Sequence, residues 1–394
     1  MTTGTDLFGL FSSPAVRPDP YGEYARLLAT QPVADAGFDV RFVFGYEDCL
    51  TLLRERRVSV DERRSNMGGS AGDQLPTLIH LDPPDHTRLR RLVSAAFTPR
   101  RVDALRARAV ALVDTALDRF VTGDEVDLIA ELAYPVPLTI ICDLLGIPTD
   151  DRAMVREWST WLALSIDPGV LRSPELNASI DVAEQAFTEY VRGAVVARRT
   201  APGDDLLSEL VAAEMDGDRL GEDELLGLAM LLLVAGHETT VSLIGNGVLA
   251  LVRHPDQLRA VRADVGGERR AVDELLRYDA PVQMTTRVAL ADIELRTATI
   301  PRGSIAVLML GSANRDPDAF ADPHRLDVRI ERTASHLALG FGIHHCLGAA
   351  LARAEGEVAI TALVRRFPHL QLVAEPELRP TFVLRSRTDL RVRL

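Results

Sequence analysis

The residues best suited to chemistry lie around Cys346, where a glycine-rich turn meets a helical pattern. A thiol binds a metal well only as a thiolate, and the free N–H groups at a helix start stabilise that charge and lower the pKa. Gly340, Gly342 and Gly348 have no Cβ, so the turn can adopt left-handed angles and a flat cofactor can approach the backbone. From Leu347 onward, apolar residues recur at helical spacing. The pattern predicts a thiolate held at the start of a rigid helix.

Other roles for Cys346 are compatible with its sequence context. A lone cysteine is most often an inert core residue. A zinc site would use His344, His345 and Cys346, but three consecutive residues seldom point at one ion, and no CxxC pair supplies further ligands. A third alternative is an acyl transferase with Cys346 as its nucleophile, activated by histidine.

A second unusual stretch is 235–240, where polar residues interrupt the apolar middle of a helical pattern that spans residues 221–253. Such a helix would be roughly 50 Å long at 1.5 Å per residue. Burying the carboxylate of Glu238 there costs several kcal/mol unless it is paired or used. His237 and Glu238 would begin a zinc-protease motif, but that motif needs a second histidine where Val241 stands.

The threonine of this stretch indicates a local distortion of the helix. The Thr239 hydroxyl can donate to the carbonyl of Ala235, four residues earlier, and bend the helix there. Gly236 leaves room beside that bend. The sequence therefore predicts a notch in the middle of the long helix.

Two polar pairs at helical spacing lie elsewhere in the chain. His86 and Arg90 are one turn apart, after a helix start at residues 82–85, so both side chains can reach one anion. Glu274 and Arg277 are three residues apart and share a helix face. On spacing alone, both pairs would be ordinary surface features, worth under about 1 kcal/mol if exposed.

Together these stretches resemble the cytochrome P450 family, the haem-thiolate monooxygenases, in its bacterial soluble form. The resemblance covers essentially the whole chain. The family signature has Phe, Gly, the ligand Cys and Gly at fixed spacing, which Gly342, Cys346 and Gly348 match. The chain departs from the signature at Leu339, where the family has the aromatic residue that packs beside the sulfur. This departure concerns the tuning of the iron potential rather than its ligation.

The resemblance implies a role for each candidate residue. Cys346 would be the axial ligand of haem b, and Glu238 and Thr239 would be the catalytic acid and alcohol that deliver protons in the dioxygen groove. The further haem contacts would be His86, Arg90, Ala235, Gly236, Arg287, Gly340, His344 and Gly348. The buried structural network would be Glu274, Arg277 and Arg325. The substrate pocket would be lined by Leu231, Val234, Ala235, Val282, Gln283 and Met284.

The composition is that of a large acidic globular protein. The chain has 394 residues, 47% of them hydrophobic, and a formal net charge of -13, which argues against nucleic-acid binding or an anionic membrane surface. All of its basic charge is arginine. Three widely spaced cysteines are no disulfide framework and favour a reducing cytoplasm. The first 13 residues have no signal-peptide pattern, and the longest apolar run, 225–235, is shorter than a membrane span, so we expect no membrane association.

The expected fold class is mainly α with a smaller β-rich region, in a P450-like arrangement with one long central helix across the haem. The whole chain, residues 1–394, is expected to form one domain. Helical patterns fill about 82–280 and 347–367. Strand patterns fall in about 32–45, 285–310 and 381–394. Residues 293–297 and 305–310 are expected to pair as a hairpin around 301–303, and 381–394 is expected to form another hairpin.

The resemblance implies a monooxygenase that inserts one oxygen atom of O2 into an apolar organic molecule by hydroxylation or epoxidation. NAD(P)H electrons would come through a separate ferredoxin and its reductase, because no flavin or ferredoxin segment is visible. Secondary metabolism, with a polyketide or macrolide as substrate, is the favoured setting. Fatty-acid, terpenoid or xenobiotic oxidation is the alternative, as is a non-catalytic haem protein that recruits a partner. The basic patch expected to dock an acidic electron donor consists of Arg88, Arg91, Arg100 and Arg101.

Overall fold

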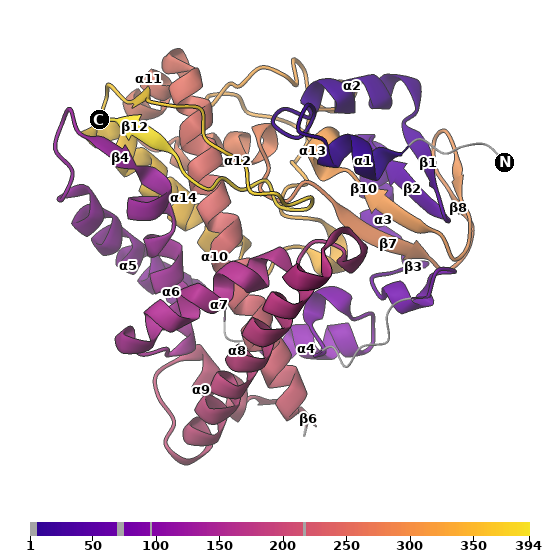
Figure 1. The fold of residues 1–394 in the computed structure, drawn as a ribbon, viewed down its shortest axis with the longest axis horizontal. Coiled ribbons are helices and arrows are strands. Elements are labelled where there is room, and N and C mark those ends of the chain that lie inside the picture. The colour runs from indigo at the N-terminus through magenta and orange to yellow at the C-terminus, as the bar shows by residue number, and fades with distance from the viewer. Residues whose placement is uncertain (1–5, 69–74, 95–96, 216–217) are drawn as a thin grey trace.

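Helices dominate the computed structural model, which describes residues 6–68, 75–94, 97–215 and 218–394 (Figure 1). The α-helices are α1 (Leu7–Ser12), α2 (Tyr21–Thr30), α3 (Tyr46–Arg54), α4 (Asp85–Ser94), α5 (Pro99–Leu117), α6 (Pro135–Leu145), α7 (Arg152–Leu164), α8 (Pro174–Thr200), α9 (Leu206–Ala212), α10 (Glu222–Arg253), α11 (Pro255–Ala263), α12 (Glu268–Tyr278), α13 (Leu310–Ala313) and α14 (Ala349–Arg366). A π-helical turn spans Ile129–Ala133, and short 3-10 turns span Glu62–Arg64, Leu78–His80, Thr149–Asp151, Gly169–Leu171 and Gly342–His344. The predicted mainly helical class is confirmed, although positions 95–96 and 216–217 of the predicted helical region lie outside the described residues.

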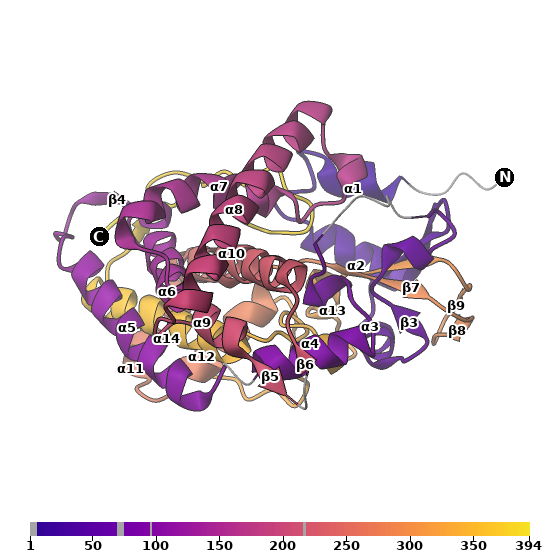
Figure 2. The same ribbon diagram turned by 90° about the horizontal axis from the view of Figure 1, so that it is seen from below.

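The long helix α10 forms where the sequence predicted it and lies across the middle of the molecule (Figure 2). At its start the Glu224 carboxylate accepts a hydrogen bond from the Gly221 backbone N–H at 2.8 Å. The three acidic residues of the first turn also complement the positive end of the helix dipole. The helix ends at Arg253, because Pro255 cannot continue its hydrogen-bond pattern and instead begins α11.

Helix α10 is the centre of the largest apolar cluster, which also takes in α5, α6, α8, α12 and α14. Figure 2 shows α8 crossing over it. By length and composition α10 is apolar enough to cross a membrane. Uninterrupted apolar runs, on which the expectation from the sequence rested, did not identify this helix as a candidate span. Since 67% of its apolar window is buried inside the protein, its hydrophobicity is accounted for by core packing.

The β-structure forms small sheets beside the helical region. The strands are β1 (Val33–Gly37), β2 (Val40–Val43), β3 (Val58–Ser59), β4 (Glu125–Asp127), β5 (Glu214–Met215), β6 (Asp218–Arg219), β7 (Thr285–Ala289), β8 (Ile293–Glu294), β9 (Thr299–Ile300), β10 (Ile305–Leu308), β11 (Gln371–Leu372) and β12 (Arg391–Arg393). The main sheet has the order β1-β2-β10-β7-β3, with β10 parallel to β2 and the other neighbours antiparallel. It lies on the side of the molecule that carries the N-terminus (Figure 1).

Two of the predicted strand pairings were wrong. In the region 285–310, β8 pairs with β9, whereas β10 joins β7 and β2 in the main sheet. The C-terminal region is not a simple hairpin, because β12 pairs with β11 and with the distant β4. Residues 378–387 instead form an irregular loop closed by an isolated bridge between Leu378 and Arg387. Strand partners this distant in sequence are set by tertiary packing rather than by local alternation.

Candidate functional site

Cys346 lies in a tight loop directly before α14, close to where the sequence predicted. Its backbone N–H donates to the Leu339 carbonyl at 2.9 Å. Gly340 and Gly342 have φ angles of +67° and +70°, the left-handed region that favours glycine. Gly348 was expected to do the same, but its φ is -83°, and it caps the start of α14. A Cβ there would meet no atom within 4 Å, so the loop leaves open space beside the cysteine.

The electrostatic setting of Cys346 differs from the expectation. Burial raises the pKa of the Cys346 thiol, and the Gly348 N–H and the charges of Arg90 and Arg353 offset this only in part. The helix start therefore does not by itself produce a thiolate. A bound cation at the sulfur would, because ligation to a metal removes the thiol proton.

Four basic side chains converge beside this loop, and we call them the basic cradle: His86, Arg90, Arg287 and His344. The rings of His86 and His344 lie 4.2 Å apart between centroids. Arg90 Nη2 donates to the His345 carbonyl at 2.8 Å, which ties α4 to the cysteine loop. Burial and the charges of His86 and Arg287 lower the pKa of His344 to about 3. The structure therefore brings together the residues that the resemblance assigned to the haem carboxylates.

Among the described residues, no acidic side chain is hydrogen-bonded to the basic cradle, although the charge of Asp82 acts on His86, Arg287 and His344. His86 is 2% exposed, and neither ring nitrogen has a hydrogen-bond partner. Arg287 is also buried and donates only to the Thr285 hydroxyl and the Thr286 carbonyl. Burial lowers the pKa of Arg287 to about 10. Buried donors and a buried cation of this kind cost free energy unless an anion completes them. The two propionates of a haem fit this set of donors.

Helix α10 presents an open face to the same region. Ala235 is exposed although most of α10 is buried, and Thr239 lies one turn further along. The Thr239 hydroxyl donates to the Ala235 carbonyl at 2.7 Å, as predicted. One further turn along, Leu243 packs with Ala338 and Leu339 of the loop that carries Cys346. The open face of α10 and the cysteine loop therefore border one space.

Gly236 has a different role from the one predicted. A Cβ at this position would lie 2.9 Å from Ile141 Cδ1, so the missing side chain allows α6 to approach α10 closely. The space beside Gly236 is filled by Ile141 rather than left for a ligand. The open part of the predicted notch is at Ala235.

Glu238 is paired with Arg379 rather than with Thr239. Its Oε2 accepts from Arg379 Nη1 at 3.0 Å, its Oε1 has no hydrogen-bond partner, and the side chain is fully buried. Burial would raise the pKa of Glu238, but the interactions with the nearby His237 ring and with Arg379 outweigh burial and hold that pKa below its usual value. No sequence pattern indicated Arg379, which is 141 positions away from its partner.

The residues predicted to line the substrate pocket lie in different surroundings. Leu231 and Val282 are half-buried and Val234 is buried in the apolar cluster around α10. The assignment of Gln283 and Met284 to the pocket was wrong, because both side chains are buried among other elements than α10. Gln283 bonds to the Tyr24 hydroxyl and the Ala280 carbonyl, at 3.2 and 2.7 Å. Met284 packs in the apolar cluster between the main sheet and the N-terminal helices.

The buried network on α12 contains a different arginine from the one predicted. Glu274 pairs with Arg277 at 2.8 Å and with Arg332 at 2.8 Å. The assignment of Arg325 to this network was wrong, because its side chain is 67% exposed beside Asp327. Only the backbone carbonyl of Arg325 takes part, accepting a hydrogen bond from Arg277 at 3.1 Å. The turn before Arg325 directs its backbone inward and its side chain outward, which spacing alone could not reveal.

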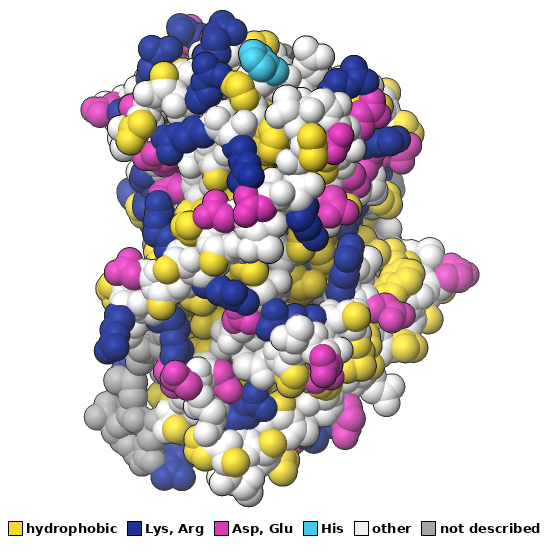
Figure 3. Space-filling view, turned by 90° about the vertical axis from the view of Figure 1, so that its left-hand side faces the viewer, with side chains coloured by type: hydrophobic (Ala, Val, Ile, Leu, Met, Phe, Trp, Pro, Cys, Tyr) yellow, Lys and Arg dark blue, Asp and Glu magenta, His cyan; other side chains and the backbone are white. Residues whose placement is uncertain are grey.

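The predicted basic patch is partly neutralised. Arg88 pairs with Glu224, and Arg101 pairs with Glu209. Arg100 remains exposed. On the face of the molecule seen in Figure 3, arginines and acidic side chains are likewise interspersed rather than segregated.

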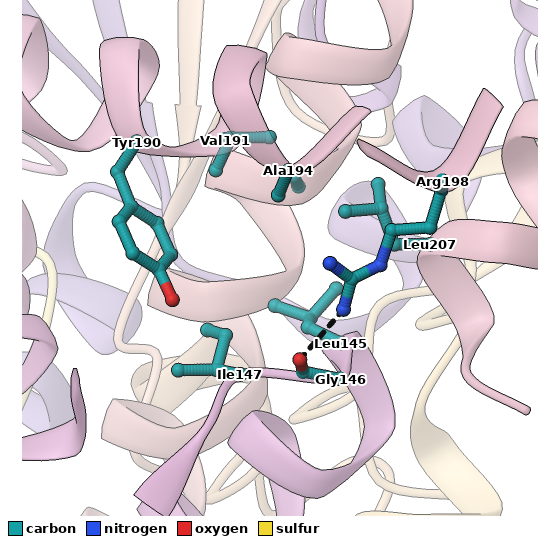
Figure 4. Close-up of a pocket in the computed structure, with 9 residues that line it drawn as sticks. Leu145, Gly146, Ile147, Tyr190, Val191, Ala194, Arg198 and Leu207 are labelled. Atoms are coloured by element: carbon teal, nitrogen blue, oxygen red, sulfur yellow. Dashed lines mark hydrogen bonds between the residues drawn. The ribbon is translucent and has the colours of Figure 1, made fainter. Parts of the chain in front are cut away.

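A separate small cavity lies between α6, α8, α9 and α10 (Figure 4). Its volume of about 20 Å³ accommodates one water molecule and not an organic substrate. Arg198 closes one side by donating to the Gly146 carbonyl at 2.7 Å. Among the described residues, no three His, Cys, Asp or Glu side chains gather as a metal site. The region between α10, the cysteine loop and the basic cradle is therefore the candidate site.

Comparison with known proteins gives one consistent answer. A profile described as Cytochrome P450 matches residues 40–389. The chain is 42% identical to cytochrome P450 monooxygenase PikC of Streptomyces venezuelae, covering 91% of this chain and 86% of PikC. It is 39% identical to 6-deoxyerythronolide B hydroxylase of Saccharopolyspora erythraea over all of both chains. The ligand-free crystal structure of CYP164A2 from Mycobacterium smegmatis superposes with a TM-score of 0.91 at 40% identity, covering 98% of this chain and 99% of that one.

Proposed function

Because the chain belongs to the cytochrome P450 family and is a P450 monooxygenase, we propose that it oxidises a macrolide or related polyketide of secondary metabolism. Family membership implies a haem-thiolate centre, a small-molecule substrate and a redox partner. The proposal of a macrolide draws on full-length similarity to a macrolide hydroxylase. We further propose that the electrons come from NAD(P)H through a separate ferredoxin and its reductase, and that the enzyme acts in the cytoplasm.

The observation that carries the proposal is the unsatisfied basic cradle beside the cysteine loop. Cys346 would ligate the iron of haem b, and the cradle would bind the haem carboxylates. Ala235, Gly340 and Gly348 would border the flat faces, since each leaves space where a larger side chain would intrude. When bound, a haem-thiolate supplies reductive activation of dioxygen and insertion of one oxygen atom.

The residues of α10 would shape the distal side of the site. Leu231, Val234 and Ala235 present an apolar surface, joined by Val282, that would hold an apolar substrate and exclude water. The Thr239 hydroxyl proton is held by the Ala235 carbonyl, so its oxygen lone pairs remain available to accept a proton or a hydrogen bond. Glu238, the next carboxylate along the helix, is the proposed proton donor for this hydroxyl.

The test of the haem centre is the spectrum of the purified protein after hemin is supplied. We expect the ferrous carbonyl complex to show the red-shifted Soret band of thiolate ligation. A protein that stays colourless with hemin would overturn the proposal.

The test of the substrate class compares macrolactones, fatty acids and terpenoids in one binding panel. We expect macrolactones to change the ferric spin state and to yield products that carry one labelled oxygen atom from labelled dioxygen. The assay supplies NADPH, a ferredoxin and its reductase. Product from fatty acids or terpenoids alone would replace the macrolide proposal with the corresponding alternative.

A further inference from the structure

The ion pair between Glu238 and Arg379 joins the centre of α10 to the C-terminal loop, residues 378–387. In Figure 1 this yellow loop runs in front of the central helices. Arg379 Nη1 lies 3.0 Å from Glu238 Oε2, and the arginine side chain is 17% exposed whereas the glutamate is fully buried. Arg379 is therefore the member of the pair that reaches solvent.

Besides Arg379, Glu238 faces His237, which also helps to hold the pKa of Glu238 down. His237 Nε2 lies 3.4 Å from Glu238 Oε1, and His237 Nδ1 contacts the Leu233 carbonyl at 2.6 Å. Tyr134, at the start of α6, stands edge-on to His237 at 5.5 Å, and its hydroxyl contacts Ser159. Arg379 is the permanently charged partner hydrogen-bonded to this carboxylate.

The C-terminal loop holds Arg379 in place through bonds at both its base and its tip. At the base, Arg379 N–H donates to the Ser386 carbonyl at 2.9 Å. At the tip, the Asp167 carboxylate accepts the backbone N–H groups of Phe382 and Val383 at 2.7 and 2.8 Å. Asp167 lies between α7 and α8, so a segment distant from α10 fixes the position of Arg379.

We propose that Arg379 is a positioning residue for proton delivery, which keeps Glu238 ionised while paired and allows it to take up a proton when the pair separates. This proposal rests on the proposed function of Glu238. In the ion pair, the carboxylate can only accept hydrogen bonds. Once separated, a buried carboxylate binds a proton from solvent, because its charged form is poorly solvated. That proton, on a Glu238 oxygen, can then pass to Thr239 Oγ1 when the side chain turns toward it.

The first experiment measures the protonation of Glu238 by infrared titration of the purified protein, which does not depend on turnover. We expect Arg379→Gln to show a protonated carboxyl band at neutral pH in addition to the band of Glu355, which the parent protein also has. The new band should vanish in the double variant with Glu238→Gln. Arg391→Gln, an exposed arginine on β12, is the charge-matched control and should titrate like the parent. An Arg379→Gln protein without the new band would overturn the proposal.

A conservative variant keeps the test decisive if Arg379→Gln folds poorly. Arg379→Lys retains a cation but loses the planar donor geometry, so we expect it to fold and to show a smaller band than the glutamine variant. Under turnover, we expect both variants to divert electrons from product to hydrogen peroxide, by about tenfold for glutamine. Unchanged coupling and an unchanged pH profile in both variants would contradict the positioning role.

The last experiment tests the link through Asp167. Asp167→Asn removes a charge that accepts two backbone N–H groups, so we expect hydrogen exchange at Phe382 and Val383 to become about tenfold faster. A weaker form of the new infrared band should accompany it. Exchange that is unchanged would remove Asp167 from the proposal. If hemin fails to bind but the bands behave as expected, the ion-pair inference stands and the proposed function fails.

Discussion

Two clusters of charged side chains, the Glu274 network on α12 and the basic cradle, differ in whether the chain itself supplies their hydrogen-bond partners. On α12, the carboxylate of Glu274 receives hydrogen bonds from Arg277, Arg332 and the Asp327 N–H. These bonds outweigh burial and hold the pKa of Glu274 below its usual value. The basic cradle has the opposite property, since two buried and two half-buried basic groups meet and, among the described residues, no acidic side chain is hydrogen-bonded to them. A saturated cluster of this kind stabilises the fold, whereas an unsaturated one indicates a bound partner.

The largest expected effect concerns the ligand atom beside the unsaturated cluster. We expect Cys346→Ser to abolish the thiolate-type Soret band and to lower monooxygenase turnover by at least about a thousandfold. The ferrous carbonyl spectrum and product formation measure this. Cys142→Ala, at a buried cysteine of α6, is the control and should retain the band. A band that survives Cys346→Ser would place the ligand elsewhere.

Breaking the saturated cluster should damage the fold. We expect Glu274→Gln to lower the free energy of unfolding by about 3–5 kcal/mol, because two arginines lose their buried counter-charge. Urea unfolding measures this.

Arg325→Gln is the matched comparison for the saturated cluster. It should change the unfolding free energy by under about 0.5 kcal/mol, because that side chain is mostly exposed. Similar losses in the two variants would show that the assignment of Arg332 in place of Arg325 is wrong.

The unsaturated cluster should respond in the opposite way. We expect Arg287→Leu to leave the stability of the haem-free protein unchanged or higher, because it removes a buried guanidinium whose hydrogen bonds among the described residues go to neutral groups. Haem affinity should fall roughly 10- to 100-fold with the loss of one charged contact. Haem transfer to a competing apoprotein and urea unfolding separate the two effects. A destabilised apoprotein with unchanged haem retention would make Arg287 purely structural.

Another buried acid, Glu355, extends the comparison to the pH dependence of stability. Glu355 is buried on α14, its Oε2 has no hydrogen-bond partner, and burial raises the pKa of Glu355 to about 8. Because the folded pKa exceeds the unfolded value of 4.5, the unfolded state releases the proton first as pH rises. The contribution of Glu355 to the free energy of unfolding should therefore be largest below pH 4.5. It should fall by up to about 1.4 kcal/mol per pH unit between pH 4.5 and about pH 8.

Glu355→Gln is the variant that isolates this term. We expect it to be more stable than the parent in urea at about pH 8 and nearly equal at about pH 4.5. A parent protein with the same pH dependence as the variant would show that Glu355 is solvated or paired in the folded state.

The sequence by itself determined the local elements and the residues within them that can do chemistry. The apolar pattern and flanking signals of α10 fixed its bounds, because capping and proline act within a few residues. The Thr239 bond to Ala235 was likewise predictable, since both groups lie on one turn. The glycine-rich turn before α14 indicated the position of Cys346 because the turn and the cysteine are only a few residues apart.

Only the tertiary structure decided which distant groups complete these elements. Arg332 rather than Arg325 reaches Glu274, and Arg379 reaches Glu238, because loops without a repeating pattern carry these arginines to their partners. Gln283 turned inward because Tyr24, from the other end of the chain, offered it a hydrogen bond. Helical and strand periods report which face of an element is buried, but a side chain on an irregular loop takes its direction from the contacts that folding brings to it.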